Sequence, residues 1–344
     1  MKQYLQYSSY NTLSFLRFSN RVLFLPSLLV YPSNMCNFDC FMCSSGSSKI
    51  KIKEEMEFSL MKRVINECSK FLFKPLLHFS GYGEPLLYSR IKDTIEECNN
   101  KKIKWSMTTN AYLLDEFMED IVVNNCNSMN VSIHGKAVQH DKITGVDGAF
   151  EKVYNSIIEL DKLKKRYNKK TPFIAINCVI NNFNVSRLKE ILELFNNMPI
   201  NSFTFQHLHF SPDDLNSNQG LNSQNLDKNN LHDLIDFLTY LENETLKIKA
   251  YTYPRIQKKD IAGYYCDMNY DFNTSCIYPW LSLEVYPNGD VQLCNQLLGN
   301  LNSYSLSSLI NNDKALEFRK LVKEGKKDLL EKPPDCFRCP HRHY

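Results

Sequence analysis

Strand-like and helix-like segments alternate along the chain from residue 27 to residue 209. The strand-like segments are short apolar runs, and the segments between them repeat apolar residues with the period of a helix. Such alternation predicts an α/β fold, in which a parallel sheet is covered by helices. Six units are too few to close an eight-stranded barrel, so we expect an open, partial (β/α)6 barrel of the TIM type. The expected strands are 27–32, 76–80, 103–109, 128–133, 173–180 and 202–209, and the expected helices are 59–72, 89–100, 115–125, 149–166 and 185–197.

Three cysteines follow the first expected strand. Cys36, Cys40 and Cys43 form a C-x3-C-x2-C motif. Thiolates at this spacing can ligate three irons of a [4Fe–4S] cluster and leave the fourth iron open to a chelating ligand. Zinc is the alternative, although a structural zinc site requires a fourth protein ligand nearby. The motif alone therefore indicates a metal site without deciding which metal it holds.

A second motif follows the second expected strand. The run 76–80 leads directly into Gly81-Tyr82-Gly83-Glu84-Pro85. Two glycines allow the backbone to approach a ligand closely, and Glu84 adds a carboxylate. A glycine pair after a strand is otherwise typical of an ordinary turn. Both motifs lie at the carboxyl ends of expected parallel strands, where ligands bind in such sheets, so we expect one shared site.

The cysteine triplet and the Gly-Tyr-Gly-Glu-Pro segment together resemble the radical S-adenosylmethionine (radical SAM) superfamily, over roughly residues 28–215. The resemblance implies a [4Fe–4S] cluster that binds S-adenosylmethionine. Reductive cleavage of this cofactor would give a 5′-deoxyadenosyl radical that abstracts hydrogen from a substrate. An electron donor such as flavodoxin or ferredoxin is implied as a partner. The implied cluster ligands are Cys36, Cys40 and Cys43, and Gly81, Gly83 and Glu84 are expected to hold the amino group of the cofactor.

Further cofactor contacts are implied at the ends of the third and fourth strands. Thr109, Asn110 and Ser132 stand where relatives contact the ribose and carboxylate of the cofactor, and Met42 stands where relatives pack the adenine. Capping of a strand end is the alternative role for the three polar residues. Many relatives carry an arginine where Thr144 stands, which leaves the partner of the cofactor carboxylate open.

A second group of cysteines lies near the C-terminus. Cys276 and Cys294 flank an Asn-Gly turn between two alternating runs, a hairpin pattern that brings its flanks together. With Cys336 and Cys339 they suit a zinc ribbon by spacing alone. The pattern resembles the SPASM domain, which implies that Cys276, Cys294, Cys336 and Cys339 bind an auxiliary [4Fe–4S] cluster. Since five residues follow Cys339, we expect one auxiliary cluster.

Three other residues are open to more than one interpretation. Cys266 precedes Cys276 by ten residues and is a candidate cluster ligand, a candidate catalytic hydrogen donor, or neither. His207 and His209 share one face of the sixth strand, where they either meet the substrate or serve the structure. The cysteines inside predicted helices and strands are expected to be buried apolar residues, namely Cys68, Cys98, Cys126 and Cys178.

Composition limits the class of protein. A net charge of +3 is too small to indicate nucleic acid or membrane as a partner. No apolar run is long enough for a transmembrane helix, and no signal peptide is evident. Twelve cysteines in so large a chain fit reduced thiols better than a secreted disulfide scaffold, so we expect a cytoplasmic protein. We expect an N-terminal extension at 1–26, a radical SAM core at 27–215, a connecting helix and strand at 216–255, and a SPASM-type domain at 256–344.

The expected function is that of a radical SAM oxidoreductase of the dehydrogenase or epimerase type. An auxiliary cluster that accepts an electron would give net oxidation, whereas hydrogen donation from Cys266 would give epimerisation. The 35 residues before Cys36 are fewer than the leader-recognition domain of many peptide maturases. That favours a small polar substrate such as a sugar or aminocyclitol. A peptide presented by a separate recognition protein is one alternative, and a non-catalytic electron-transfer or scaffold protein is another.

Overall fold

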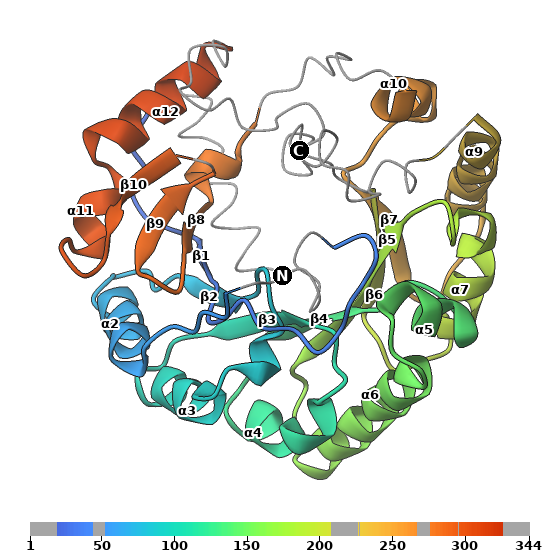
Figure 1. Ribbon diagram of the computed structural model, residues 1–344, viewed down its shortest axis with the longest axis horizontal. Helices are drawn as coiled ribbons and strands as arrows, with labels where there is room; N and C mark the ends of the chain where they lie inside the picture. Colours follow the sequence, from blue (N-terminus) through green and yellow to red (C-terminus); the bar gives the residue numbers. More distant parts are fainter. Residues whose placement is uncertain are drawn as a thin grey trace.

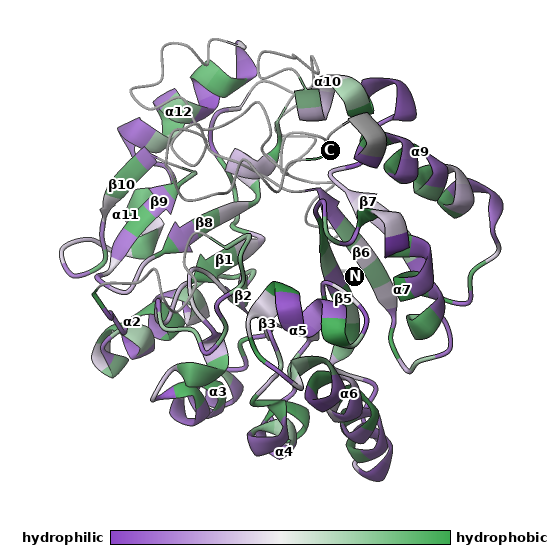
Figure 2. Cartoon of the chain, turned by 45° about the vertical axis from the view of Figure 1, so that its right-hand side comes forward, coloured by the Kyte–Doolittle hydropathy of each residue, from purple (hydrophilic) through white to green (hydrophobic). Residues whose placement is uncertain are grey.

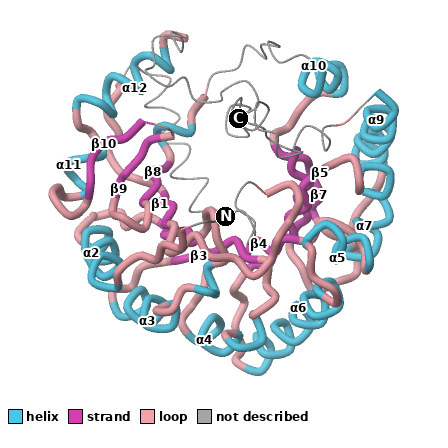
Figure 3. Tube along the Cα trace, viewed as in Figure 1, coloured by secondary structure: helices cyan, strands magenta, loops and turns pink. Residues whose placement is uncertain are grey.

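The structure is a computed structural model that describes residues 19–43, 52–207, 226, 228–266, 276–294 and 296–325. Its strands form one curved sheet in the order β10-β9-β8-β1-β2-β3-β4-β5-β6-β7. Figures 1 and 3 show the strands on an inner arc with the helices outside them. This arrangement is the open α/β barrel that the alternating sequence predicts.

The first six strands pair in parallel, each with its neighbour in the sequence. Their positions confirm the expected strands, with differences of a few residues at the ends. The strands are β1 (Ser27–Val30), β2 (Leu76–Phe79), β3 (Trp105–Thr109), β4 (Ser128–Ser132), β5 (Phe173–Ile180) and β6 (Ser202–His207), and the helices between them are α2 (Phe58–Ser69), α3 (Ile91–Asn100), α4 (Met118–Val123), α6 (Ala149–Arg166) and α7 (Leu188–Phe195).

One further helix, α5 (Val138–Thr144), was not expected from the sequence. It is short, and it ends at Gly145, whose φ of 73° lies in the left-handed region that glycine favours. Two turns give too few positions for a periodic apolar pattern, which explains why the sequence did not reveal it. Its C-terminal residues contact the cysteine loop, as described below.

The sheet extends beyond the six core strands on both sides. Helix α9 (Lys228–Asn243) and strand β7 (Lys249–Tyr253), expected as a connector, add a parallel strand beside β6. On the other side β8 (Ser282–Val285) pairs in parallel with β1, with Ser27 opposite Ser282. The C-terminal segment therefore continues the sheet of the core. Its other elements are α10 (Ile261–Cys266), β9 (Asp290–Leu293), β10 (Gln296–Asn300), α11 (Leu306–Ile310) and α12 (Asp313–Lys323).

The two faces of the core strands differ in polarity. Alternate residues such as Phe79, Met107 and Ile176 are completely buried, and they belong to one continuous hydrophobic core. Several of the residues between them are polar and partly buried, as at Asn130 and Gln206. The covering helices carry both hydrophobic and hydrophilic residues (Figure 2), as expected for helices with one face on a sheet. None of the described helices is long and apolar enough to cross a membrane.

Candidate functional site at the carboxyl ends of the strands

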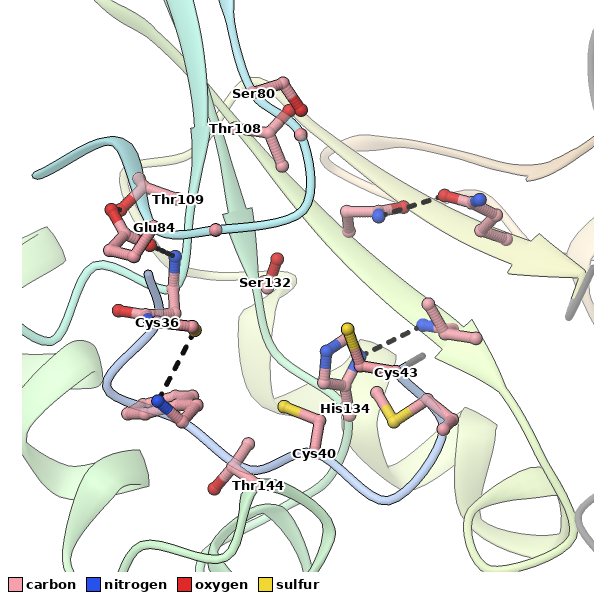
Figure 4. A pocket seen from close by; sticks show the side chains of 18 of the residues that line it. Cys36, Cys40, Cys43, Ser80, Glu84, Thr108, Thr109, Ser132, His134 and Thr144 are labelled. Atoms are coloured by element: carbon pink, nitrogen blue, oxygen red, sulfur yellow. Dashed lines mark hydrogen bonds between the residues drawn. The ribbon is translucent and has the colours of Figure 1, made fainter. Parts of the chain in front are cut away.

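A cavity of about 390 Å³ lies at the carboxyl ends of the core strands (Figure 4), and its volume falls in the range typical of ligand pockets. The loop after β1 and the ends of β2 to β6 form its walls. All the residues expected around the cluster and cofactor line it. They are Cys36, Cys40 and Cys43 together with Met42, Gly81, Gly83, Glu84, Thr109, Asn110 and Ser132.

The cysteine loop is held by backbone hydrogen bonds to two other segments. Asp39 and Phe41 donate their N–H groups to the carbonyls of Thr144 and Ile143, at 3.0 and 3.2 Å. The N–H of Glu84 donates to the carbonyl of Met35 at 2.7 Å. The C-terminal turn of α5 and the loop after β2 therefore fix the loop from both sides, which positions its thiols at the cavity.

The three thiols lie in a partly buried environment. Burial raises the pKa of Cys36 to about 11, and it raises that of Cys40 as well. Without a positive partner these groups stay protonated at neutral pH, so a cationic metal centre is the partner that would stabilise the thiolates. Within the described part of the chain, no three Cys, His, Asp or Glu side chains surround a position for a single metal ion. A cubane cluster differs because each thiolate binds a separate iron.

Glu84 connects the ends of two strands and is almost completely buried. Its Oε1 accepts hydrogen bonds from the N–H of Leu86 at 3.0 Å and from Oγ1 of Thr109 at 2.6 Å. Its Oε2 accepts the N–H of Asn110 at 2.7 Å. Burial raises the pKa of this carboxyl to about 7, although all three donors favour the ionised form. Its proposed contact with the cofactor remains a prediction.

The two glycines beside Glu84 are needed for close packing against the protein itself. A Cβ at Gly83 would lie 2.5 Å from the carbonyl oxygens of both Met35 and Ser33. Gly81 has a φ of 122°, and a Cβ there would overlap the ring of Tyr31. The structure shows close approach of these glycines to the cysteine loop and to Tyr31. Both glycines also line the cavity, and their close approach to a ligand stays a prediction.

His134, just after β4, lines the cavity but was not among the residues expected to bind the cofactor. Its Nδ1 accepts the N–H of Val179 at 3.2 Å. A backbone N–H can only donate, so Nδ1 carries no hydrogen. Burial lowers the pKa of His134 to about 3, so the ring is neutral at neutral pH. Its one ring hydrogen is therefore on Nε2. No described residue hydrogen-bonds this Nε2–H group. Its place directly after a strand is the sequence signal that could have identified it.

The opposite wall of the cavity is polar and comes from β5 and β6. Asn177 donates from Nδ2 to Oε1 of Gln206 at 3.1 Å. Nδ1 of His207 lies 2.7 Å from the hydroxyl of Tyr265 on α10. His207 thus lines the cavity and also has a structural partner, while His209 lies outside the described residues.

The second group of cysteines is only partly described. The expected hairpin is present, with Glu284 opposite Gln292. Cys276 precedes β8 and Cys294 follows β9, so both lie at the same end of this antiparallel pair. Because β8 is parallel to β1, that end of the sheet is opposite the cavity. Cys336 and Cys339 lie outside the described residues.

Cys266 is the last residue of α10, and its side chain is exposed. It is not among the described residues that line the cavity. The four cysteines expected as apolar core residues, Cys68, Cys98, Cys126 and Cys178, are completely buried.

Comparisons with known proteins connect both segments to families. The radical SAM superfamily profile matches residues 30–195, and that of the SPASM iron–sulfur cluster-binding domain matches residues 276–340. A probable GTP 3′,8-cyclase of Saccharolobus islandicus is 26% identical over 191 residues, which are 54% of this chain and 58% of that protein. The chain therefore matches little more than half the length of this curated relative.

Two solved structures share the fold. SuiB of Streptococcus suis bound to S-adenosylmethionine superposes with a TM-score of 0.64 at 18% identity, over 92% of this chain and 72% of SuiB. The protein anSMEcpe with bound AdoMet gives a TM-score of 0.61 at 18% identity, over 86% and 84% of the two chains. Both family profiles match, and one cavity holds the cysteine triplet together with the Gly-Tyr-Gly-Glu-Pro segment. The chain therefore belongs to the radical SAM superfamily of enzymes and carries a C-terminal iron–sulfur cluster-binding domain of the SPASM type.

Proposed function

We propose that this enzyme abstracts a hydrogen atom from a small polar substrate and completes a net two-electron oxidation with the help of one auxiliary cluster. The observation that carries the proposal is that two sets of residues share one cavity. One wall holds the cysteines and the residues expected around S-adenosylmethionine, and the other wall holds neutral polar side chains. Cofactor and substrate would therefore meet in the same space.

The residues of the first wall suit the implied cofactors. Cys36, Cys40 and Cys43 would ligate the cluster, and Glu84 would meet the amino group of S-adenosylmethionine. Bound together, these cofactors supply a one-electron route for removing hydrogen from an unactivated carbon. The chain contributes the positions of its ligands, which are set by the contacts of Asp39 and Phe41 with α5.

His134 would bind the carboxylate of the cofactor. Thr144, which stands where relatives have arginine, donates its hydroxyl hydrogen to the carbonyl of His140 at 3.0 Å. Its hydroxyl therefore has no second hydrogen to offer a carboxylate. The Nε2–H group of His134 and the hydroxyl of Ser132 are donors on residues that line the same cavity. We infer that they replace the missing arginine.

The second wall favours an uncharged, hydrogen-bonding substrate. Asn177, Gln206 and His207 offer amide and imidazole groups, and the cavity lining contains no lysine or arginine among the described residues. A triphosphate would call for such cations. Hydroxyl and amine groups of a sugar or aminocyclitol suit amide side chains, which both donate and accept.

A peptide substrate is the second candidate. The fold matches SuiB over 92% of this chain, and SuiB has also been solved bound to its precursor peptide SuiA. In that case a separate protein would present the peptide, and Cys266 would be the candidate hydrogen donor for epimerisation. A non-catalytic iron–sulfur protein is the alternative to both enzymes.

Anaerobic reconstitution followed by substrate screening tests the proposal. We expect about eight irons per chain, and about four in a Cys36→Ala, Cys40→Ala, Cys43→Ala variant. With dithionite, the wild-type protein should cleave S-adenosylmethionine to 5′-deoxyadenosine and methionine. Neutral sugars and aminocyclitols should accelerate the cleavage, and carbon-bound deuterium should pass from the true substrate into 5′-deoxyadenosine. Stimulation by peptides alone would favour the second candidate, and absence of any cleavage would favour the non-catalytic alternative.

A further inference from the structure

Arg319 on α12 is completely buried, with 0% of its side chain exposed. Its Nε donates to the carbonyl of Pro279 at 2.8 Å, and its Nη1 donates to the carbonyl of Ile310 at 2.8 Å. None of the ion pairs among the described residues includes this guanidinium. A buried charge is costly unless an opposite charge compensates for it, so Arg319 requires an anion.

Among the described residues, one nitrogen of the guanidinium is left to meet such an anion. Nη2 is buried and has no hydrogen-bond partner among the residues that the structure describes. Carbonyl groups satisfy Nε and Nη1, but carbonyl oxygens do not neutralise a full positive charge. Burial lowers the pKa of Arg319 only to about 10, so the group remains charged at neutral pH.

Arg319 is linked to both described cysteines of the second group, Cys276 and Cys294. Pro279, which accepts from Nε, lies three residues after Cys276. Cys294 is close enough that its thiolate would interact favourably with the guanidinium. Cys294 also has a φ of 53°, a left-handed conformation that costs a residue with a Cβ about 1–2 kcal/mol. Its thiol is thus held at a strained turn beside a buried cation.

We propose that Arg319 is the internal counter-ion of the auxiliary cluster and that its Nη2 donates a hydrogen bond to a sulfur of that cluster. This inference rests on the proposed cluster at Cys276, Cys294, Cys336 and Cys339. Four thiolates give such a cluster a net negative charge, which increases when it accepts an electron. A fixed positive charge and an N–H···S hydrogen bond both stabilise the reduced form, so Arg319 raises the reduction potential of the cluster.

The consequence is an auxiliary cluster that accepts an electron more readily. When bound, the cluster would supply the acceptor for one electron of the proposed two-electron oxidation, and the accompanying proton would pass to a base. A higher potential makes that electron transfer more favourable. Arg319 would act on the redox step without touching the substrate.

The test compares two substitutions in the full chain that carries Ala at Cys36, Cys40 and Cys43, so that only the auxiliary cluster contributes. The midpoint potential is measured by a redox titration followed by electron paramagnetic resonance. Arg319→Met should lower the equilibrium constant for reduction at least tenfold, which is about 59 mV for one electron. Arg319→Lys should retain most of the wild-type potential. An unchanged potential in Arg319→Met, with the cluster intact, would overturn the proposal.

A second measurement does not require the Arg319→Met variant to fold. The same triple-Ala protein with native Arg319 is labelled with 15N-arginine, and its reduced cluster is examined for hyperfine coupling to a guanidinium nitrogen. Coupling that disappears in Arg319→Lys supports the proposal, and absence of coupling contradicts it. Zinc instead of iron at the second cysteine group would show that the proposed cluster itself is wrong, which is a separate failure.

Discussion

Glu84 and Asn110 are joined by a hydrogen bond of 2.7 Å from the backbone N–H of Asn110 to Oε2 of the carboxylate. This bond links the loop after β2 to the loop after β3 at the wall of the cavity. Asn110 in turn donates from Nδ2 to Oδ1 of Asn37 at 2.7 Å, within the cysteine loop. A chain of contacts thus runs from the carboxylate to the expected cluster ligands. The residue proposed to bind the cofactor is also part of the framework that positions the cluster.

The buried carboxyl of Glu84 predicts a specific dependence of stability on pH. Burial raises its pKa from 4.5 to about 7, so between these values the folded protein binds more protons than the unfolded chain. The contribution of Glu84 to stability is therefore fully present below pH 4.5 and is lost as the pH rises through 7. For metal-free protein, the difference in free energy of unfolding between wild type and Glu84→Gln should fall by on the order of 3 kcal/mol as the pH rises from 4.5 through 7. Urea titrations at several pH values measure it, and a constant difference would contradict the prediction.

Glu84 should also determine affinity for the cofactor. Glu84→Gln keeps the size of the side chain and removes the negative charge, so we expect affinity for S-adenosylmethionine to fall about 10- to 100-fold, as for loss of a charged hydrogen bond. The iron content should stay unchanged because Glu84 is not a cluster ligand. Glu55→Gln is the matched control, since it makes the same substitution at a carboxylate that accepts the N–H of Ser89 and does not line the cavity. The affinities are measured by equilibrium binding of S-adenosylmethionine to reconstituted protein. Equal affinities in wild type and Glu84→Gln would show the assignment to be wrong.

Gly83→Ala should disturb the cluster site without touching a ligand. The new Cβ would lie 2.5 Å from two backbone carbonyl oxygens, so the cysteine loop has to move. We expect the variant to lose most of the iron of the first site and to keep that of the second. Gly148→Ala is the control, because no atom lies within 4 Å of a Cβ there, although its φ of 74° adds some strain. Iron analysis after reconstitution distinguishes the two, and full iron in Gly83→Ala would contradict the steric argument.

Much of the core could be predicted from the sequence because its signals are local. Strands such as β5 are apolar runs at regular intervals, and the cysteine triplet and Glu84 directly follow such strands. In a parallel sheet, position at the carboxyl end of a strand fixes the edge on which a side chain lies. For that reason every residue expected around the cofactor was found in one cavity.

The features that the sequence did not reveal depend on contacts between distant segments. Helix α5 is too short for a periodic pattern, and its role comes from two hydrogen bonds to the cysteine loop. The pairing of β8 with β1 joins segments about 250 residues apart, as the register of Ser27 with Ser282 shows. The state of His134 depends on the N–H of Val179 on another strand. None of these has a signature within its own segment.

His134 should contribute to cofactor binding through Nε2 alone. His134→Asn retains an acceptor near the position of Nδ1 but removes the donor at Nε2, so we expect weaker binding of S-adenosylmethionine by about tenfold, the value of a typical charged hydrogen bond. His134→Gln can place an amide N–H near the position of Nε2 and should bind more tightly than His134→Asn. Iron content should be normal in both variants. Isothermal titration compares their affinities, and the reverse order would exclude the proposed donor.

The fate of the substrate radical separates the roles of Cys294 and Cys266. If the auxiliary cluster accepts the electron, Cys294→Ala should still produce 5′-deoxyadenosine but only a small fraction of the oxidised product, because hydrogen abstraction needs the first cluster alone. Cys266 is exposed at the end of α10 and is not among the described cavity residues, so Cys266→Ala should leave both products near wild-type levels. Both products are quantified by mass spectrometry from reactions in heavy water. Solvent deuterium at the abstracted carbon, lost in Cys266→Ala, would instead establish epimerisation with Cys266 as the hydrogen donor.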